Sequence, residues 1–169
     1  MARVREVQTE SLARVAFSDR TPHRPSRSQK PSIRAGLAYE KKFGDFLQAA
    51  PRPPDADLLA GPWLEFHDAL GPGFAQPDFL LISPRGIYIF ECKLTQNTKA
   101  WIQLYRLYSP LMRKLLPGVP LKHVQVCRNL RPEPQALEAL GRMGLPPAPV
   151  ISRARELRDH CIWNWRPGP

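Results

Sequence analysis

Residues 77–94 read PDFLLISPRGIYIFECKL, and this stretch decides the fold. Its two apolar runs, FLLI and IYIF, flank Ser-Pro-Arg-Gly, a sequence typical of a tight turn. We therefore expect strands over residues 78–83 and 87–95, joined as a hairpin and hence antiparallel. Because side chains alternate along a strand, Glu91 and Lys93 should share one face of the second strand.

Charged residues gather where the two expected strands meet. Asp78 opens the first strand, so its carboxylate can converge with Glu91 and Lys93. Carboxylates bind Mg²⁺ or Mn²⁺, and the carbonyl of Cys92 could serve as a backbone ligand. Lys93 could orient an attacking water or stabilise negative charge on phosphorus. The alternative is that Asp78 caps a turn while Glu91 and Lys93 form a surface pair.

A helix is expected upstream, over residues 32–50, with Ser32 as its N-cap. Leu37 and Phe43 mark its apolar stripe, together with Phe46 and Leu47. The spacing places Glu40 on or beside the buried face, where it could add a metal ligand or hold a water. Pairing with a nearby lysine on the helix edge is the alternative for Glu40.

The rest of the chain predicts further elements of both kinds. They are a strand at 62–68, a turn region at 71–77, a long helix from Asn97 or Thr98 kinked near Pro110, a strand at 122–130, a short helix at 134–143, a strand at 149–152, and a terminal helix or coil at 153–165. This order indicates an α/β domain over residues 32–169, with a central mixed sheet flanked by helices.

The basic charge is concentrated at the N-terminus. The chain has 169 residues and a net charge of +10, and residues 1–34 hold eight basic and three acidic residues. We interpret residues 1–31 as a basic arm rich in Pro and Arg. It could bind phosphates, form a solvated tail, or act as a transit peptide. The overall charge favours a polyanion, above all nucleic acid, as the partner.

Composition excludes several classes of protein. No apolar run approaches the ~20 residues of a membrane helix, so no membrane partner is expected. The three cysteines are scattered without metal-type spacing, which argues against a disulfide framework and for the cytoplasm. The sequence contains no GxxxxGK[ST] loop, so it does not predict nucleotide hydrolysis.

The spacing of Pro77-Asp78 and Glu91-Cys92-Lys93 resembles the signature of the PD-(D/E)XK nuclease superfamily, whose fold is restriction-endonuclease-like. The stretch 77–94 is similar to the nuclease-related domain of bacterial proteins, and the helix with Glu40 resembles the first core helix of the superfamily. Gln103 is similar in placement to a glutamine of RecB-type nucleases. The resemblance covers roughly residues 33–130 and implies Mg²⁺-dependent DNA cleavage that leaves a 5′-phosphate.

Our hypothesis is a Mg²⁺- or Mn²⁺-dependent deoxyribonuclease that acts on branched or otherwise structured DNA, such as a junction, flap or end. Asp78, Glu91 and Lys93 would be catalytic, with Glu40 in support. Contacts to DNA are expected from Arg85, Lys99, Gln103 and Arg106. A junction resolvase would need a homodimer. The protein would act in a bacterial cytoplasm, or as a phage protein in that of the host. The alternatives are a non-catalytic nucleic-acid-binding module on the same fold and a structural or assembly protein.

Overall fold

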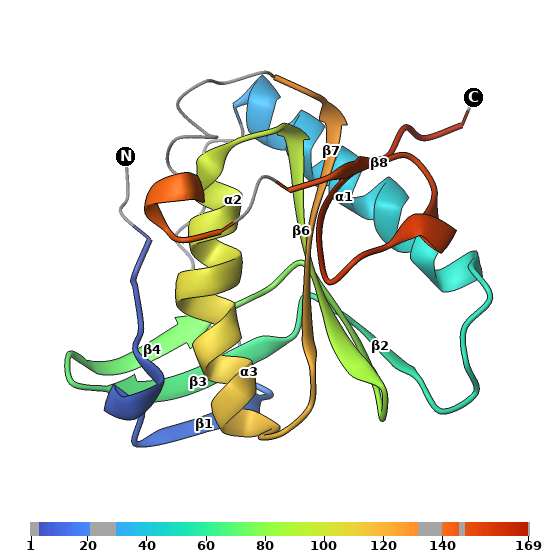
Figure 1. Cartoon of the computed structure of the whole chain (residues 1–169). Helices are drawn as coiled ribbons and strands as arrows, with labels where there is room; N and C mark the ends of the chain where they lie inside the picture. The colour runs from blue at the N-terminus through green and yellow to red at the C-terminus, as the bar shows by residue number, and fades with distance from the viewer. Residues whose placement is uncertain (1–3, 21–29, 132–139, 146–147, 169) are drawn as a thin grey trace.

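A six-stranded mixed sheet forms the centre of the computed structural model, which describes residues 4–20, 30–131, 140–145 and 148–168 (Figure 1). The strand order is β2-β5-β6-β7-β9-β8. Strands β2, β5 and β6 pair antiparallel, whereas β6, β7, β9 and β8 pair in parallel. The strands span Asp57–Ala60 (β2), Phe79–Ser83 (β5), Gly86–Thr95 (β6), Leu121–Asn129 (β7), Val150–Ile151 (β8) and His160–Asn164 (β9).

The expected hairpin is confirmed as β5 and β6. Its register places Ser83 opposite Gly86 at the turn and Phe79 opposite Phe90 at the other end. Strand β6 continues for five more residues, 91–95, beyond the start of β5. The edge of β6 over these residues therefore has no β5 partner, although its other edge pairs with β7 throughout.

Helix α1 (Pro31–Ala49) covers one face of the sheet and buries Tyr39, Phe43 and Leu47. It begins at Pro31, one residue before the expected cap, because proline suits the first helical turn. Gly44 brings the helix close to β5, since a Cβ there would lie 2.9 Å from the ring of Phe79. The prediction that Leu37 joins the core is wrong, because that side chain is 51% exposed.

The other face is covered by one continuous helical rod. It comprises α2 (Thr98–Gln103), a π-helical segment (Leu104–Tyr108) and α3 (Ser109–Leu115). Asn97 is its N-cap, accepting a 3.0 Å hydrogen bond from the backbone N–H of Ala100. Pro110, which lacks a backbone donor, is the second residue after the widened π turn, near where the sequence predicts a kink.

A second, three-stranded sheet packs beside α3 (Figure 1). One of its strands lies within residues 1–31, so the prediction that all of these residues form an arm is wrong in part. Strands β1 (Arg14–Ser18) and β4 (Gly71–Ala75) pair antiparallel with β3 (Trp63–Asp68) on either side. Residues 71–77, expected as a turn region, thus contain a strand. A 3₁₀ turn (Thr9–Ser11) precedes β1, and Val7 and Leu12 are buried in the core. Residues 4–20 are therefore part of the folded body, and residues 21–29 of the expected arm lie outside the described residues.

The C-terminal end differs from the expected helix or coil. After a short 3₁₀ turn (Ala154–Glu156), β9 enters the sheet between β7 and β8, because its apolar run buries Cys161, Ile162 and Trp163. The strand expected near residue 150 is confirmed as β8. Residues 132–139, which hold most of the helix expected at 134–143, lie outside the described residues. The expected fold class, a mixed sheet flanked by helices, is confirmed. No described helix is long and apolar enough to span a membrane.

Candidate active site

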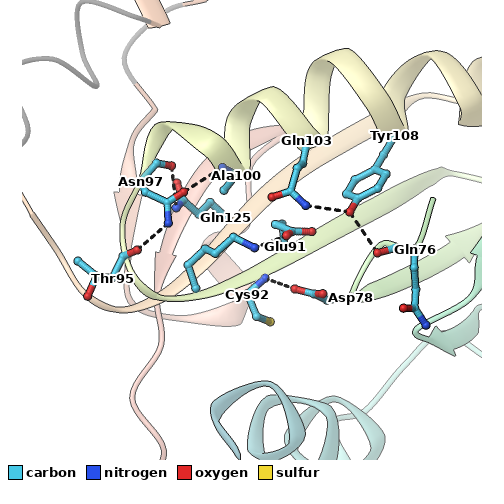
Figure 2. A network of polar contacts seen from close by, with 11 residues as sticks. Gln76, Asp78, Glu91, Cys92, Thr95, Asn97, Ala100, Gln103, Tyr108 and Gln125 are labelled. Carbon is cyan, nitrogen blue, oxygen red and sulfur yellow. Dashed lines mark hydrogen bonds and ion pairs between the residues drawn. The ribbon is translucent and has the colours of Figure 1, made fainter. Parts of the chain in front are cut away.

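Asp78 stands at the open edge of β6, immediately before β5. Its Oδ2 accepts a 2.6 Å hydrogen bond from the backbone N–H of Cys92 (Figure 2). In an extended strand the N–H and C=O of one residue face the same side, so the Cys92 carbonyl also faces this edge. The carboxylate thus takes the place that a longer β5 would occupy, and the backbone of Cys92 is directed toward Asp78.

Glu91 and Lys93 lie on the face of β6 that is covered by the helical rod, as their spacing predicts. Lys93 Nζ contacts Glu91 Oε1 in an ion pair. Glu91 is 1% exposed, and its Oε2 is buried without a hydrogen-bond partner among the described residues. The alternative of a surface pair is therefore wrong, since the carboxylate is inside the molecule with half of its accepting capacity unused.

Burial raises the pKa of both carboxylates. Burial, followed by the negative charge of Asp78, raises the pKa of Glu91 to about 8, although Lys93 opposes the shift. Burial also raises the pKa of Asp78 against the influence of Lys93 and of the Cys92 N–H. Burial disfavours the charge on Lys93, but Glu91 and Asp78 together raise its pKa. The lysine is therefore a cation, and the pair of acids carries less negative charge than two free carboxylates would.

Gln103 and Tyr108 lie behind Glu91 in the same polar network, and Tyr108 was not among the expected functional residues. Tyr108 Oη donates to the carbonyl of Gln76 at 3.1 Å and accepts from Gln103 Nε2 at 3.2 Å (Figure 2). Residues five apart face different directions in an α-helix, but the π turn brings Gln103 and Tyr108 together. Burial, then Glu91 and Asp78, raises the pKa of Tyr108. Its place in the apolar stripe indicated a core residue, and only the π geometry shows its polar role.

An open pocket of about 500 Å³ leads to this network. Asp78, Lys93 and the backbone region of Cys92 line it from the strands, and Glu40 lines it from α1. A neighbouring hollow of about 370 Å³ shares Glu40 and Asp78 with it. Glu40 also contributes, after burial, Asp78 and Glu91, to raising the pKa of the Cys92 thiol. Glu40 is thus beside the site, as its helical position predicts.

The donor set for a metal ion is small. Within the described ranges, no three His, Cys, Asp or Glu side chains are close enough together to form a metal site. Glu40 comes from the α1 face of the sheet and Glu91 from the face under the helical rod, so the three carboxylates do not converge on one point. The groups that could hold a divalent cation are Asp78, Glu91 and the Cys92 carbonyl, with water completing the shell.

The expected DNA-contacting residues do not gather around the site. Gln103 faces inward to Tyr108, so it belongs to the network. Lys99 is exposed near the start of α2, two residues after Asn97, which lines the pocket. Arg85 lies in the turn at the opposite end of the β5–β6 hairpin from Asp78. Arg106 Nη1 donates to Glu6 Oε2 at 2.6 Å, and Arg106 lines a separate hollow beside Glu6 and Asp68. Arg85 and Arg106 are therefore remote from the carboxylates, and their expected contacts with DNA stay predictions.

The fold and this pocket define an α/β protein with an Asp-Glu-Lys site at the open edge of its hairpin. A model of the family described as "nuclease-related domain" matches residues 35–128, so the chain belongs to that family, within the restriction-endonuclease-like superfamily. No curated protein sequence matches the chain. Among solved structures, protein VC1899 from Vibrio cholerae is similar, with 20% identity and a TM-score of 0.40. The match covers 64% of this chain and 27% of that protein.

Proposed function

We propose that this protein is a metal-dependent deoxyribonuclease that hydrolyses phosphodiester bonds in DNA. The observation that carries the proposal is the position of Glu91, which is buried against Lys93 and Asp78, with no hydrogen bond to its Oε2 from any residue that the structure describes. Burying an incompletely paired acid beside a second acid destabilises a fold. Perturbed groups of this kind cluster at functional sites. Membership of the nuclease-related family supports a catalytic role for Glu91 as the reason why the fold retains this unfavourable group.

The residues present fit a divalent cation. Two buried carboxylates whose pKa values are both raised, together with a backbone carbonyl at the same edge, form the oxygen-rich environment that Mg²⁺ or Mn²⁺ selects. Asp78 Oδ1, Glu91 Oε2 and the Cys92 carbonyl would hold it. When bound, such an ion polarises a phosphoryl oxygen and lowers the pKa of a coordinated water.

Lys93 acts on the same phosphate through its charge. Its pKa is raised, so it remains an ammonium at neutral pH and cannot serve as a general base. It lines the pocket at 25% side-chain exposure, where it can stabilise the negative charge that grows on the phosphoryl oxygens. Water attacks phosphorus, the bond to the 3′ oxygen breaks, and the products carry a 5′-phosphate and a 3′-hydroxyl. Glu40, across the pocket, can orient that water.

DNA is the proposed partner because the chain carries a net charge of +10 and the site faces an open pocket. We infer that the substrate is branched or otherwise structured DNA, encountered in the cytoplasm. The three cysteines are buried free thiols, as a reducing compartment allows. Cleavage of a symmetric junction would require two copies of the chain, each contributing one site.

The test is cleavage of labelled branched, single-stranded and duplex DNA with Mg²⁺, with Mn²⁺ and with EDTA. We expect cation-dependent cleavage by the wild type and a loss of about 10²- to 10³-fold in Asp78→Asn and Lys93→Met. Asp55→Asn, an exposed loop substitution, is the matched control and should cleave at the wild-type rate. Cation-independent DNA binding without cleavage would identify a non-catalytic binding module and overturn the proposal.

A further inference from the structure

One wall of the pocket is apolar. Ile33 and Leu37, on the first turns of α1, are 37% and 51% exposed, although the rest of the helix buries its large apolar side chains. With Gly36 they line the same pocket as Asp78 and Lys93. We call Ile33, Gly36 and Leu37 the α1 wall. Exposed apolar side chains beside a candidate catalytic group mark a surface that something covers.

Gly36 keeps this wall open. It lies inside a 19-residue helix, where glycine is less favourable than alanine. Among the described residues, no atom outside the adjoining turns of the helix lies within 4 Å of the position that its Cβ would occupy, so their packing does not require glycine there. Gly44, two turns later, contrasts with it, because a Cβ at Gly44 would meet Phe79. The space beside Gly36 is part of the pocket, and a side chain there would reduce it.

The chemistry of the α1 wall distinguishes the parts of a nucleotide. The wall offers no charged or hydrogen-bonding side chain to a phosphate, whereas Lys93 across the pocket does. Apolar side chains instead pack against the faces of bases and sugars, as the apolar wedges of DNA-bending proteins do. A phosphate at Lys93 and Asp78 would therefore have its adjoining nucleoside against Ile33 and Leu37.

From this arrangement we infer that the protein selects DNA with an unpaired nucleotide next to the scissile phosphate, whose base packs on the α1 wall. In a continuous duplex the base faces are stacked on their neighbours and cannot reach the wall. Single strands and single-stranded flaps present them freely. The inference rests on the proposed nuclease function and names the substrate class within it.

The experiment compares three labelled substrates of equal length, a single strand, a duplex with a single-stranded flap and a blunt duplex. Cleavage is measured with Mg²⁺. Binding is measured by fluorescence anisotropy with the wild type in EDTA, so that affinity is obtained without hydrolysis. We expect the two substrates with unpaired nucleotides to be cleaved and bound at least about tenfold better than the blunt duplex, the scale of one base contact.

Substitutions on the α1 wall separate this inference from general DNA binding. Gly36→Leu fills the pocket, and Leu37→Asn removes the apolar contact. Both should reduce the preference for unpaired DNA to less than about threefold. Ala38→Leu, exposed on the same helix and outside the pocket, and Leu70→Asn, at a distant exposed leucine, are the matched controls and should retain the preference. The melting temperature of Gly36→Leu should equal or exceed that of the wild type, because leucine favours the helix more than glycine does, and that of Leu37→Asn should fall only slightly, because asparagine is a weaker helix former than leucine.

Each outcome decides either the nuclease function or the recognition of unpaired DNA. Equal cleavage of all three substrates by the wild type would overturn the inference and leave the nuclease function standing. No cleavage of any substrate, with a binding preference that Leu37→Asn abolishes, would overturn hydrolysis and support the recognition of unpaired DNA. A preference for unpaired DNA that neither wall variant alters would also overturn the inference, because recognition would then lie elsewhere.

Discussion

Two buried carboxylates in this protein are each paired with a cation, and they behave in opposite ways. Asp68, at the end of β3, accepts from both Arg5 Nε and Arg5 Nη2 and from the backbone N–H of Leu70. The hydrogen bonds from Arg5 lower its pKa. Glu91 pairs with Lys93 through one oxygen and lies beside the Tyr108 hydroxyl, and burial raises its pKa. Arg5 pairs with both oxygens of its acid, but Lys93 reaches only one.

The difference shows what a structural and a reactive acid require. The Asp68 pair joins residues 4–12 to the β3–β4 turn, and its donors satisfy the charge completely. Glu91 is left with an unpartnered oxygen beside Asp78, a state that a cation or a bound substrate would relieve. The comparison therefore predicts a stabilising role for Asp68 and, under the proposed function, a catalytic role for Glu91, and each prediction can be tested.

The largest effect should appear in the pH dependence of stability. The folded pKa of Glu91, about 8, is above its unfolded value of 4.5, so the folded state keeps a proton that the unfolded state releases. In the absence of divalent cations, the free energy of unfolding should therefore fall as pH rises from about 4.5 to 8, by as much as about 1.4 kcal/mol per unit. Urea titrations of Glu91→Gln should give a flatter profile and a more stable protein at pH 8. An identical slope in wild type and variant would contradict the raised pKa.

Asp68→Asn should have the converse result. Losing the charge that holds Arg5 should lower the free energy of unfolding by about 2–3 kcal/mol at pH 7. Because the pKa of Asp68 is lowered, its stabilisation is present above the unfolded pKa and is lost as pH falls through the folded value, and the variant should lack that acid-dependent loss. Asp45→Asn, which removes the exposed pair with Lys41, should change stability by less than about 0.5 kcal/mol. Retained DNA cleavage by Asp68→Asn below its melting temperature would confirm that this acid is structural.

Divalent cations should stabilise the protein by binding at Asp78 and Glu91, and not at Asp68. At pH 8, Mg²⁺ at about a hundred times its dissociation constant should add roughly 2.7 kcal/mol to the free energy of unfolding. The increase should disappear with EDTA and in Asp78→Asn, and it should persist in Asp68→Asn. Thermal melts with and without Mg²⁺ measure it. Equal stabilisation of Asp78→Asn would place the cation elsewhere.

The smallest effect is expected at Tyr108. Tyr108→Phe removes the hydrogen bond to the Gln76 carbonyl and leaves Gln103 without its acceptor, at a cost of about 1 kcal/mol in stability. If the network positions Glu91, cleavage should also fall by about three- to tenfold, with the change in kcat rather than in KM. A purely structural tyrosine would change stability alone.

The sequence predicted the centre of the site because its information is local. Turn residues and apolar alternation define the hairpin, and the period of a strand then places Glu91 and Lys93 on one face. Because the turn is short, the start of the first strand lies beside the end of the second, and this places Asp78 near Glu91. These relations involve fewer than 20 consecutive residues, so no distant contact can alter them.

The errors involve partners far apart in the chain. The glycines and proline of β4 indicated a turn, and pairing with β3 overrode that propensity. The buried run in β9 was compatible with helix or strand, and only its place beside β7 decides between them. The role of Tyr108 depends on a π turn that helical periodicity does not reveal.

The N-terminal strand β1 has a practical consequence for anyone who shortens this protein. The family match spans residues 35–128, but a chain cut to those limits would lose β1 and expose the outer edge of β3, with its backbone amides and carbonyls unsatisfied. It would also remove β9 and the edge cover of β7. Such a fragment would aggregate through its exposed strand edges, so the intact chain should be expressed and purified instead.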